Sequence, residues 1–352
     1  MADNKLTAQQ RAQLFAMSTR QNLQMLAKES AGTTPATLSF NLPKARLLGS
    51  AMIKVKGTMK VTGAGTPKEH ANELGIYKAI RRISLDLNNG FAPFVVSGEE
   101  LAIYNLIGMH PEMYASKTFA EVKEVPADIY TEGEHAFEFA LPLQVALNGR
   151  DPIGLILLQN DQTNVTLTVD LGTGNEVMSE YATECTAEMT DISVMCMLET
   201  FSIPANANAY PDLSVLKLVN GRKDSMPTSG QQILKLTTGT IYRKIAIRVT
   251  DENGEAVTPE FINSNIELVF NQADINYSVH PEMLRLWNIK EFGQAMPEGV
   301  YVLDFSNAGS FPDLGGNRDV IDSANLTEMW LRFNTTGKGK VEIVTECLAR
   351  LS

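Results

Sequence analysis

Apolar and polar residues alternate along much of the chain beyond residue 37. In residues 53–61 the apolar side chains fall on one face of an extended chain and three lysines on the other: Ile53, Val55, Met59 and Val61 against Lys54, Lys56 and Lys60. The same alternation recurs in residues 83–87, 137–141, 165–171, 245–249 and 329–333. A period of two predicts strands with one buried and one wet face, which is typical of antiparallel sheets. No regular succession of strands and helices is visible, so the sequence predicts a mostly β protein rather than a doubly wound α/β fold.

Short loops are predicted where Asn precedes Gly, because both residues tolerate the positive φ of tight hairpin turns. The four pairs of this kind are Asn89-Gly90, Asn148-Gly149, Asn220-Gly221 and Asn253-Gly254.

The first 28 residues follow a different pattern. Thr7 and Gln10 have the spacing of a capping box, and good helix formers continue as far as Lys28. The segment carries a net charge of +3, which leaves −14 on the rest of the chain; its charged residues are Lys5, Arg11, Arg20 and Lys28 against Asp3. We expect an N-terminal helix here. It either docks on the body or forms a basic amphipathic arm that contacts an acidic surface such as lipid headgroups.

A connector is predicted near the middle of the chain. Small and polar residues lie between Pro204 and Pro211 and interrupt the alternation. The sequence therefore predicts three parts: an N-terminal helical arm (1–36), a first β domain (37–204) and a second β domain (205–352).

The two β halves resemble each other at a constant offset of 183 residues. Residues 83–88 match residues 266–271, and residues 94–106 match residues 277–289. Within the second match, Val96, Glu99, Leu101, Tyr104 and Asn105 fall on Val279, Glu282, Leu284, Trp287 and Asn288. Two strands and a short helix that repeat at one spacing indicate an internal duplication.

The size of the repeated unit selects among β folds. About 140–170 residues exceed an immunoglobulin-type sandwich of roughly 100. An eight-stranded jelly roll fits this length, and viral capsids are a common setting for it. We therefore expect two tandem jelly-roll barrels with an N-terminal helix. The excess length lies in residues 108–133 and 172–191, as surface excursions.

Composition narrows the function further. The 352 residues carry a net charge of −11, which argues against direct, specific nucleic-acid binding by the body. No secretory signal and no membrane-spanning apolar stretch is visible, so we expect synthesis in the host cytoplasm. Three cysteines make no disulfide framework, and Cys196 lies in an apolar run where burial is expected.

Catalytic chemistry is not evident in the sequence. Its four histidines lack His-x-His and HExxH spacing, which disfavours a metal-binding, cupin-like enzyme, and no phosphate-binding loop occurs. Residues 251–255 faintly resemble a calcium loop, but position twelve is Ile262, so a turn is the better interpretation. Glu99 and Glu100 are expected to be solvated or to cap the short helix. We predict no enzyme, no metal and no cofactor.

Several segments together resemble a known family. They are the Gln-rich residues 6–14, Leu-Pro-Leu-Gln-Val at 141–145, residues 151–158 and 165–171, and Met-Pro-Glu-Gly-Val-Tyr-Val-Leu-Asp at 296–304. In order and kind they are similar to the major coat protein of tectiviruses, which are double-stranded DNA viruses with double jelly-roll capsid proteins. The resemblance covers most of the chain as an order of elements.

The resemblance implies a structural capsid protein of an icosahedral virion. Two barrels per chain and three chains would form a pseudo-hexagonal homotrimeric capsomer. Its partners would be further copies, penton and minor capsid proteins, and an internal membrane. The N-terminal helix would lie on the inner side, a role that falls on Lys5, Arg11, Arg20 and Lys28.

The alternative is a binding module, either a viral spike or a carbohydrate-binding jelly roll. Such a module would present aromatic residues on its loops. The two tryptophans, Trp287 in the repeated helix and Trp330 in an alternating strand, are instead predicted to be packing residues.

Overall fold

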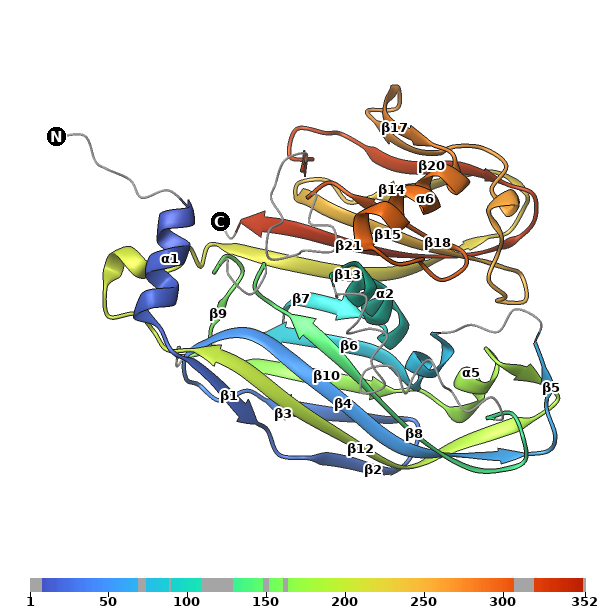
Figure 1. Cartoon of the computed structure of the whole chain (residues 1–352), viewed down its shortest axis with the longest axis horizontal. Helices are drawn as coiled ribbons and strands as arrows, with labels where there is room; N and C mark the ends of the chain where they lie inside the picture. The colour runs from blue at the N-terminus through green and yellow to red at the C-terminus, as the bar shows by residue number, and fades with distance from the viewer. Residues whose placement is uncertain are drawn as a thin grey trace.

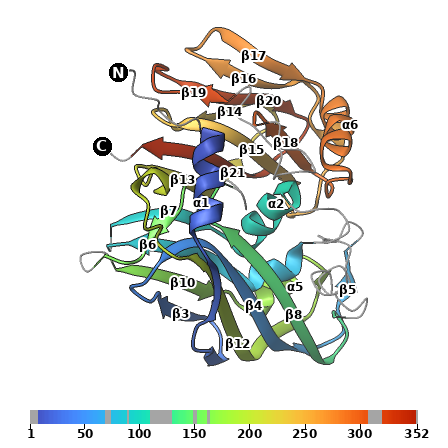
Figure 2. The same ribbon diagram turned by 60° about the vertical axis from the view of Figure 1, so that its left-hand side comes forward.

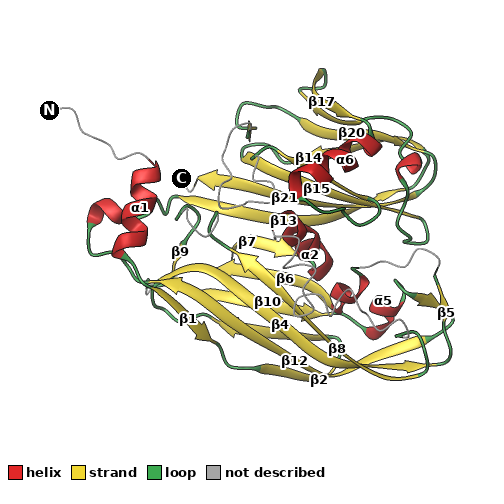
Figure 3. Ribbon diagram, viewed as in Figure 1, coloured by secondary structure: helices red, strands yellow, loops and turns green. Residues whose placement is uncertain are grey.

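Strands dominate the computed structural model, which describes residues 8–68, 74–88, 90–108, 129–147, 152–160, 164–306 and 320–350 (Figures 1 and 3). They form two barrels side by side, which we call barrel 1 and barrel 2. In both views the N-terminal half of the chain builds barrel 1 and the C-terminal half builds barrel 2 (Figures 1 and 2).

Barrel 1 has eight principal strands in two facing sheets. These strands are β1 (Gln21–Met25), β3 (Ala36–Asn41), β4 (Leu47–Thr62), β6 (Ile80–Leu87), β7 (Phe91–Val96), β8 (Gly133–Gln144), β10 (Val165–Leu171) and β12 (Thr186–Phe201). One sheet has the order β1-β12-β4-β8 and the other β7-β6-β10-β3. The shorter elements are β2 (Glu29–Thr33), β5 (Thr66–Pro67), β9 (Ile156–Leu157), β11 (Ala182–Thr183), α1 (Ala8–Ser18), η1 (Gly75–Ala79), α2 (Gly98–Gly108) and α5 (Gly174–Met178).

Barrel 2 repeats this plan. Its principal strands are β13 (Val215–Met226), β14 (Gly230–Leu236), β15 (Ile241–Asp251), β16 (Ile266–Phe270), β17 (Asp274–Val279), β18 (Val300–Asp304), β20 (Met329–Thr335) and β21 (Gly339–Arg350). Its strands have the orders β13-β21-β15-β18 and β17-β16-β20-β14, and the first set continues through β13 and β7 into β7-β6-β10-β3 of barrel 1, so that these strands and β19 form one nine-stranded sheet. The shorter elements are η2 (Ala207–Ala209) in the connector, η3 (Pro259–Phe261), α6 (Pro281–Phe292) and β19 (Ile321–Asp322).

The two barrels have the same strand order. If the eight principal strands of each are numbered along the chain, both barrels have one sheet in the order 1-8-3-6 and one in the order 5-4-7-2. This is the double Greek-key arrangement of a jelly roll. The segments that match at an offset of 183 fall on equivalent elements: β6 and β16, β7 and β17, α2 and α6. The prediction of two tandem jelly rolls is therefore confirmed.

The alternating segments of the sequence all lie in strands. Burial alternates along β4, where Ile53, Val55, Met59 and Val61 are buried inside barrel 1. Segment 83–87 departs from this pattern, because Ser84 is buried between Ile83 and Leu85. Segment 245–249 departs further, because β15 is buried on both faces from Tyr242 to Thr250. Its polar face does not meet water, since it packs against barrel 1.

The Asn-Gly pairs have mixed outcomes. Asn253-Gly254 lies in the turn after β15, where Gly254 has a φ of 78°. Gly90 lies in the turn between β6 and β7, whereas Asn89 and the pair Asn148-Gly149 fall outside the described residues. The prediction for Asn220-Gly221 is wrong, because both residues lie inside β13 and pair with β21.

The N-terminal helix is shorter than its sequence predicts. α1 ends at Ser18, and residues 21–33 form β1 and β2, which both pair with β12. Ladder hydrogen bonds along β12 outweigh the helix propensity of this segment, as tertiary context often does. Thr7, the expected cap, lies outside the described residues. Residues 21–33 thus belong to the first sheet of barrel 1 rather than to a helical arm.

The barrels are joined by main-chain pairing and by a shared core. β7 of barrel 1 pairs in parallel with β13 of barrel 2, at Phe94 with Val219 and Val95 with Asn220. The core of barrel 1 continues across this junction to apolar residues of barrel 2, among them Val219, Ala246 and Val344. Burial of apolar surface on both sides makes the two barrels one packed body.

Candidate functional site

The interface between the barrels holds the largest concentration of buried charge in the described part of the chain. We call it the seam: α2 and β7 on the side of barrel 1, and β13, β15 and β21 on the side of barrel 2. Because β13, β21 and β15 are neighbours, residues that pair across them share the face that meets α2. One such row is Lys223, Glu342 and Arg248, and another is Val219, Glu346 and Lys244.

α2 is positioned by its first turn. Ser97 and Glu100 form a capping box: the Glu100 amide donates to Ser97 Oγ at 3.1 Å, and the Ser97 amide donates to Glu100 Oε2 at 2.7 Å. The capping role predicted for the acidic pair is confirmed for Glu100. Solvation is wrong for both residues, since Glu99 and Glu100 are buried. A Cβ on Gly221 of β13 would overlap the Glu100 carboxylate, so the glycine allows α2 to approach the strand.

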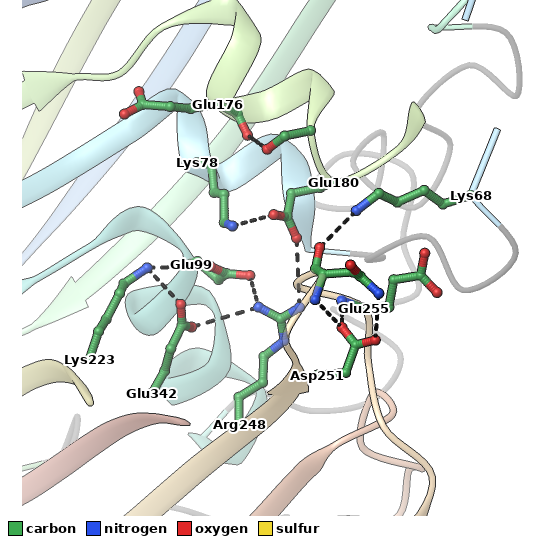
Figure 4. A network of polar contacts seen from close by, with 12 residues as sticks. Lys68, Lys78, Glu99, Glu176, Glu180, Lys223, Arg248, Asp251, Glu255 and Glu342 are labelled. Carbon is green, nitrogen blue, oxygen red and sulfur yellow. Dashed lines mark hydrogen bonds and ion pairs between the residues drawn. The ribbon is translucent and has the colours of Figure 1, made fainter. Parts of the chain in front are cut away.

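Arg248 lies at the centre of the first charge cluster (Figure 4). It is 2% exposed, and its guanidinium binds Glu99 of α2 and lies 3.7 Å from Glu342 and 3.8 Å from Glu180. Lys223 pairs with Glu342 at 2.6 Å and lies 3.7 Å from Glu99. The cluster therefore ties elements of both barrels together by charge.

A second cluster lies farther along α2. Tyr104 donates a hydrogen bond to Glu346 of β21, and Arg243 donates to the other carboxylate oxygen at 2.6 Å. Lys217 of β13 donates to the main-chain oxygen of Ala146 at 2.8 Å and to the Tyr104 hydroxyl at 3.3 Å. All four side chains are buried, so each hydrogen bond here replaces one that water would make.

Burial and neighbouring charges shift the pKa values of these groups in different directions. Burial raises the pKa of Glu100 to about 7 and lowers that of Lys217 to about 7. Burial would also raise the pKa of Glu346, but Lys244, Lys217 and Arg243 outweigh it and bring the pKa down to about 2. Burial and the nearby Glu99 raise the pKa of Glu342. Glu346 is thus an anion at neutral pH, whereas Glu100 and Lys217 titrate close to neutral pH.

A cavity of about 560 Å³ opens beside the first cluster, and Lys68, Lys78, Lys223, Arg248 and Lys340 contribute its positive charges. Lys78 pairs with Glu180, and Lys68 donates to the main-chain oxygen of Asn253 at 3.1 Å. Among the described residues, no group of His, Cys, Asp and Glu could hold a metal ion. Paired charges on facing elements act to hold the barrels in one relative orientation.

The four basic residues predicted for an inner-facing arm do not form one group. Lys5 lies outside the described residues. Arg11 is half-buried on α1 and acts on Asp212 in the connector, where it contributes to the lowered pKa of that carboxyl; the first causes are hydrogen bonds from Ser214. Arg20 is exposed before β1, and Lys28 is exposed between β1 and β2, roughly 25 Å farther along at the rise of an extended strand.

α1 itself is docked on the body. Phe15 is buried and meets the ring of Phe201 edge-on, with ring centroids 5.6 Å apart. It shares a small apolar cluster with Leu47, Ala146 and Leu155. Of the two roles considered for the N-terminal helix, this packing favours docking for residues 8–18. None of the helices in the described ranges is long and apolar enough to cross a membrane.

The buried charges of the seam have no signature in the sequence. Arg248 and Glu342 stand at alternating positions of strands, where a charged residue ordinarily faces water, and no local signal distinguishes them. One expectation about aromatic residues is also wrong: Trp287 is 53% exposed rather than packed. Trp330 is half-buried, and Cys196 is buried as expected.

Several solved structures share this architecture. No family model matches the chain, and no curated protein matches it. Among solved structures, the major capsid protein of Sulfolobus Turreted Icosahedral Virus is similar with a TM-score of 0.67 and 14% identity, over 94% of this chain and 97% of that one. VP54 of PBCV-1 is similar with a TM-score of 0.66 and 10% identity, over 95% of each chain. The major capsid protein P2 of bacteriophage PM2 gives 0.54 and 10%, over 95% of this chain and 98% of that one. At these identities the likeness shows the fold, which is that of viral double jelly-roll capsid proteins.

Proposed function

We propose that this chain is a major capsid protein that builds the shell of an icosahedral virus. The observation that carries the proposal is the extent of the match: at least 94% of this chain aligns with at least 95% of each of the three capsid chains. Both barrels, in the same order, are therefore part of the likeness. Residues 37–204 and 205–352 are the two domains we propose, with β1 and β2 added to the first.

The capsomer we propose is a homotrimer with a pseudo-hexagonal outline. Three chains with two equivalent barrels each place six barrels around one axis, which fits a sixfold lattice position. The partners are further copies, and penton and minor capsid proteins at the edges of the lattice. An obligate assembly of this kind commonly buries about 2,000 Å² or more per interface.

Native mass spectrometry and light scattering on the purified full chain test this proposal. We expect three copies of the 38.6 kDa chain and no free monomer at micromolar concentration. Negative-stain images of the trimer should show a hexagonal outline. A protein that stays monomeric at tens of micromolar would count against the capsomer.

We further propose that the end of the molecule near α1 faces the interior of the virion, towards an internal membrane. Support comes from the positive charge of Arg11 and Arg20 at this end of an acidic chain, with Lys5 preceding them in the sequence. Lys28 is left out because it lies well along barrel 1. Vesicles with and without anionic lipid provide the test. Charge reversal at Lys5 and Arg20 should abolish binding to anionic vesicles, and equal binding by the variant would contradict the proposal.

A further inference from the structure

The helices α2 and α6 are docked on their barrels in the same rotational position. Asn105 of α2 donates a hydrogen bond to the main-chain oxygen of Pro142 in β8, at 2.9 Å. Asn288 of α6, its counterpart at an offset of 183, donates to the oxygen of Val302 in β18, at 2.8 Å. β8 and β18 are equivalent strands, so the same contact sets the rotation of both helices. The inward residues Leu101 and Leu284 are also equivalent, and both are buried.

The outward face of α2 is covered by the next barrel. Glu100 lies against Gly221 of β13, and Tyr104 bonds to Glu346 of β21. Gly221 and Glu346 both lie on the outer face of the strands β13-β21-β15-β18. The charges are complementary, since Glu99 of the helix meets Arg248 and Lys223 of the sheet.

Among the described residues, no barrel covers the outward face of α6 in this way, and this face is apolar. At the positions equivalent to Glu100, Ile103, Tyr104 and Leu106, which are all buried, α6 carries Met283, Leu286, Trp287 and Ile289. These four side chains are 59%, 59%, 53% and 42% exposed. Four large apolar side chains on one short helix form a patch of the kind that marks a protein interface.

A matching surface exists on barrel 1. The sheet equivalent to the one that covers α2 is β1-β12-β4-β8, and Met25, Met197 and Met52 pair across its first three strands. Side chains that pair across antiparallel strands share a face. This face points outward: Met25 is 57% exposed, and Met197 and Met52 are half-buried. Leu23, also on β1, is 59% exposed.

The edge strands of the two barrels correspond in the same way as their helices and sheet faces. In the chain, the edge strand β7 of barrel 1 pairs with the edge strand β13 of barrel 2. Their counterparts are β17 of barrel 2 and β1 of barrel 1, and each ends its sheet within the described residues. β17 lies at the end of the molecule away from barrel 1, whereas β1 and β2 lie on the opposite side (Figure 1). β17 and β1 therefore cannot pair within one molecule.

We infer that α6 and β17 of one copy dock on the outer face of β1, β12 and β4 of the next copy, in the same way that α2 and β7 dock on barrel 2 within the chain. The chemistry of each pair agrees: acidic α2 meets a basic sheet face, and apolar α6 meets a row of methionines, whose flexible side chains adapt to a partner. The contact joins two different surfaces, so it is heterologous, and it forms a ring where the rotation between copies closes, as in the proposed capsomer. The inference rests on the proposed capsomer only for the number of copies in the ring.

Paired variants of the full chain test the two surfaces. Leu286→Glu with Trp287→Glu alters the α6 face, and Leu23→Glu with Met25→Glu alters the β1 face. Each pair should raise the dissociation constant between copies by at least ~100-fold, as loss of central apolar anchors does. Ile233→Glu is the matched control, because Ile233 is 46% exposed on β14, away from both surfaces. It should leave association unchanged.

Mixing the two double variants gives the sharper result. Each retains one intact surface, so an equimolar mixture should form two-copy complexes and nothing larger by native mass spectrometry. Misfolded chains could not restore association in this way. If α6 instead packed against a second α6, the β1 variant would associate like the wild type and the mixture would gain nothing, which would overturn the inference.

The outcomes for the inference and for the capsomer are separable. A wild-type trimer that persists when α6 and β1 are altered overturns the inference and leaves the capsomer standing. A wild-type monomer counts against both. A wild-type assembly of another size, lost in both variants, supports the heterologous contact and contradicts the trimer.

Discussion

At the scale of single residues, Glu100 couples the seam to pH. Its pKa in the folded chain is about 7, against 4.5 for a free side chain, because burial disfavours the charge. The folded state then holds a proton that the unfolded state has already lost between pH 4.5 and 7. The stability that this proton supplies is complete below pH 4.5 and is lost as the pH rises through 7.

We therefore predict that Glu100→Gln stabilises the protein at alkaline pH. The amide keeps an oxygen for the Ser97 amide but cannot ionise, so the advantage should be near zero below about pH 4 and reach about 3 kcal/mol at pH 8. Urea unfolding across this range measures it. Glu282→Gln, at an exposed position of α6, controls for the loss of a carboxylate. A constant difference between Glu100→Gln and wild type at every pH would show that Glu100 does not titrate in the folded state.

A second residue-scale prediction concerns the glycine opposite Glu100. Gly221→Ala places a methyl group where the Glu100 carboxylate lies, so either α2 or β13 must move. We expect the free energy of unfolding to fall by roughly 1–3 kcal/mol. Gly32→Ala on β2 is the control, because a Cβ there meets no atom within 4 Å. Equal stability of the two variants would contradict the close approach of α2 to β13.

Single residues also mark the limit of sequence reasoning. The Asn220-Gly221 pair predicted a turn, because local preference is all that a dipeptide reveals. Its glycine instead serves a contact with a helix 121 positions earlier in the chain. Arg248 likewise alternates with apolar neighbours as a solvent-facing residue would. Only the docking of a second barrel on that face decides whether such a residue meets water or Glu99.

At the scale of elements, strands with a clean period of two could be predicted, and the N-terminal helix only in part. β4, β10 and β20 each bury one face, so their pattern records their environment directly. β1 has a single apolar pair, Leu23 and Met25, and both are exposed in the isolated chain. Its strand conformation comes from pairing with β12, and a sequence window does not contain that partner.

This difference predicts unequal effects of two N-terminal truncations. Removal of residues 1–18 takes away α1 and the contact between Phe15 and Phe201, at a cost of roughly 1.5–3 kcal/mol. Removal of residues 1–28 also takes β1 from its ladder with β12, so the free energy of unfolding should fall further. Chemical denaturation of both truncated chains compares them. Identical midpoints would indicate that β1 adds nothing to barrel 1.

At the scale of the whole molecule, the duplication could be predicted from sequence, whereas the way in which the copies meet could not. The offset of 183 residues placed equivalent strands and helices correctly, because both copies must fill the same jelly-roll positions. The outward faces of the two equivalent helices differ in chemistry. That of α2, which meets barrel 2 within the chain, is acidic, whereas that of α6 is apolar. They share an arrangement rather than a sequence, so comparison of the halves does not reveal them.

The seam should also determine how the molecule unfolds. An apolar core that crosses the junction and a buried charge cluster with Arg248 at its centre predict that both barrels unfold in one cooperative transition.

Arg248→Ala leaves Glu99, Glu180 and Glu342 without their shared cation, and loss of one partner from a buried ion pair costs about 3–5 kcal/mol. Because that loss falls on the junction, we expect calorimetry to resolve two transitions in this variant. Arg332→Ala removes a partly exposed pair with Glu267 inside barrel 2, and it should cost no more than about 1 kcal/mol and keep a single transition. A wild-type chain that already unfolds in two steps would mean that the barrels are held side by side by the connector and β7 alone.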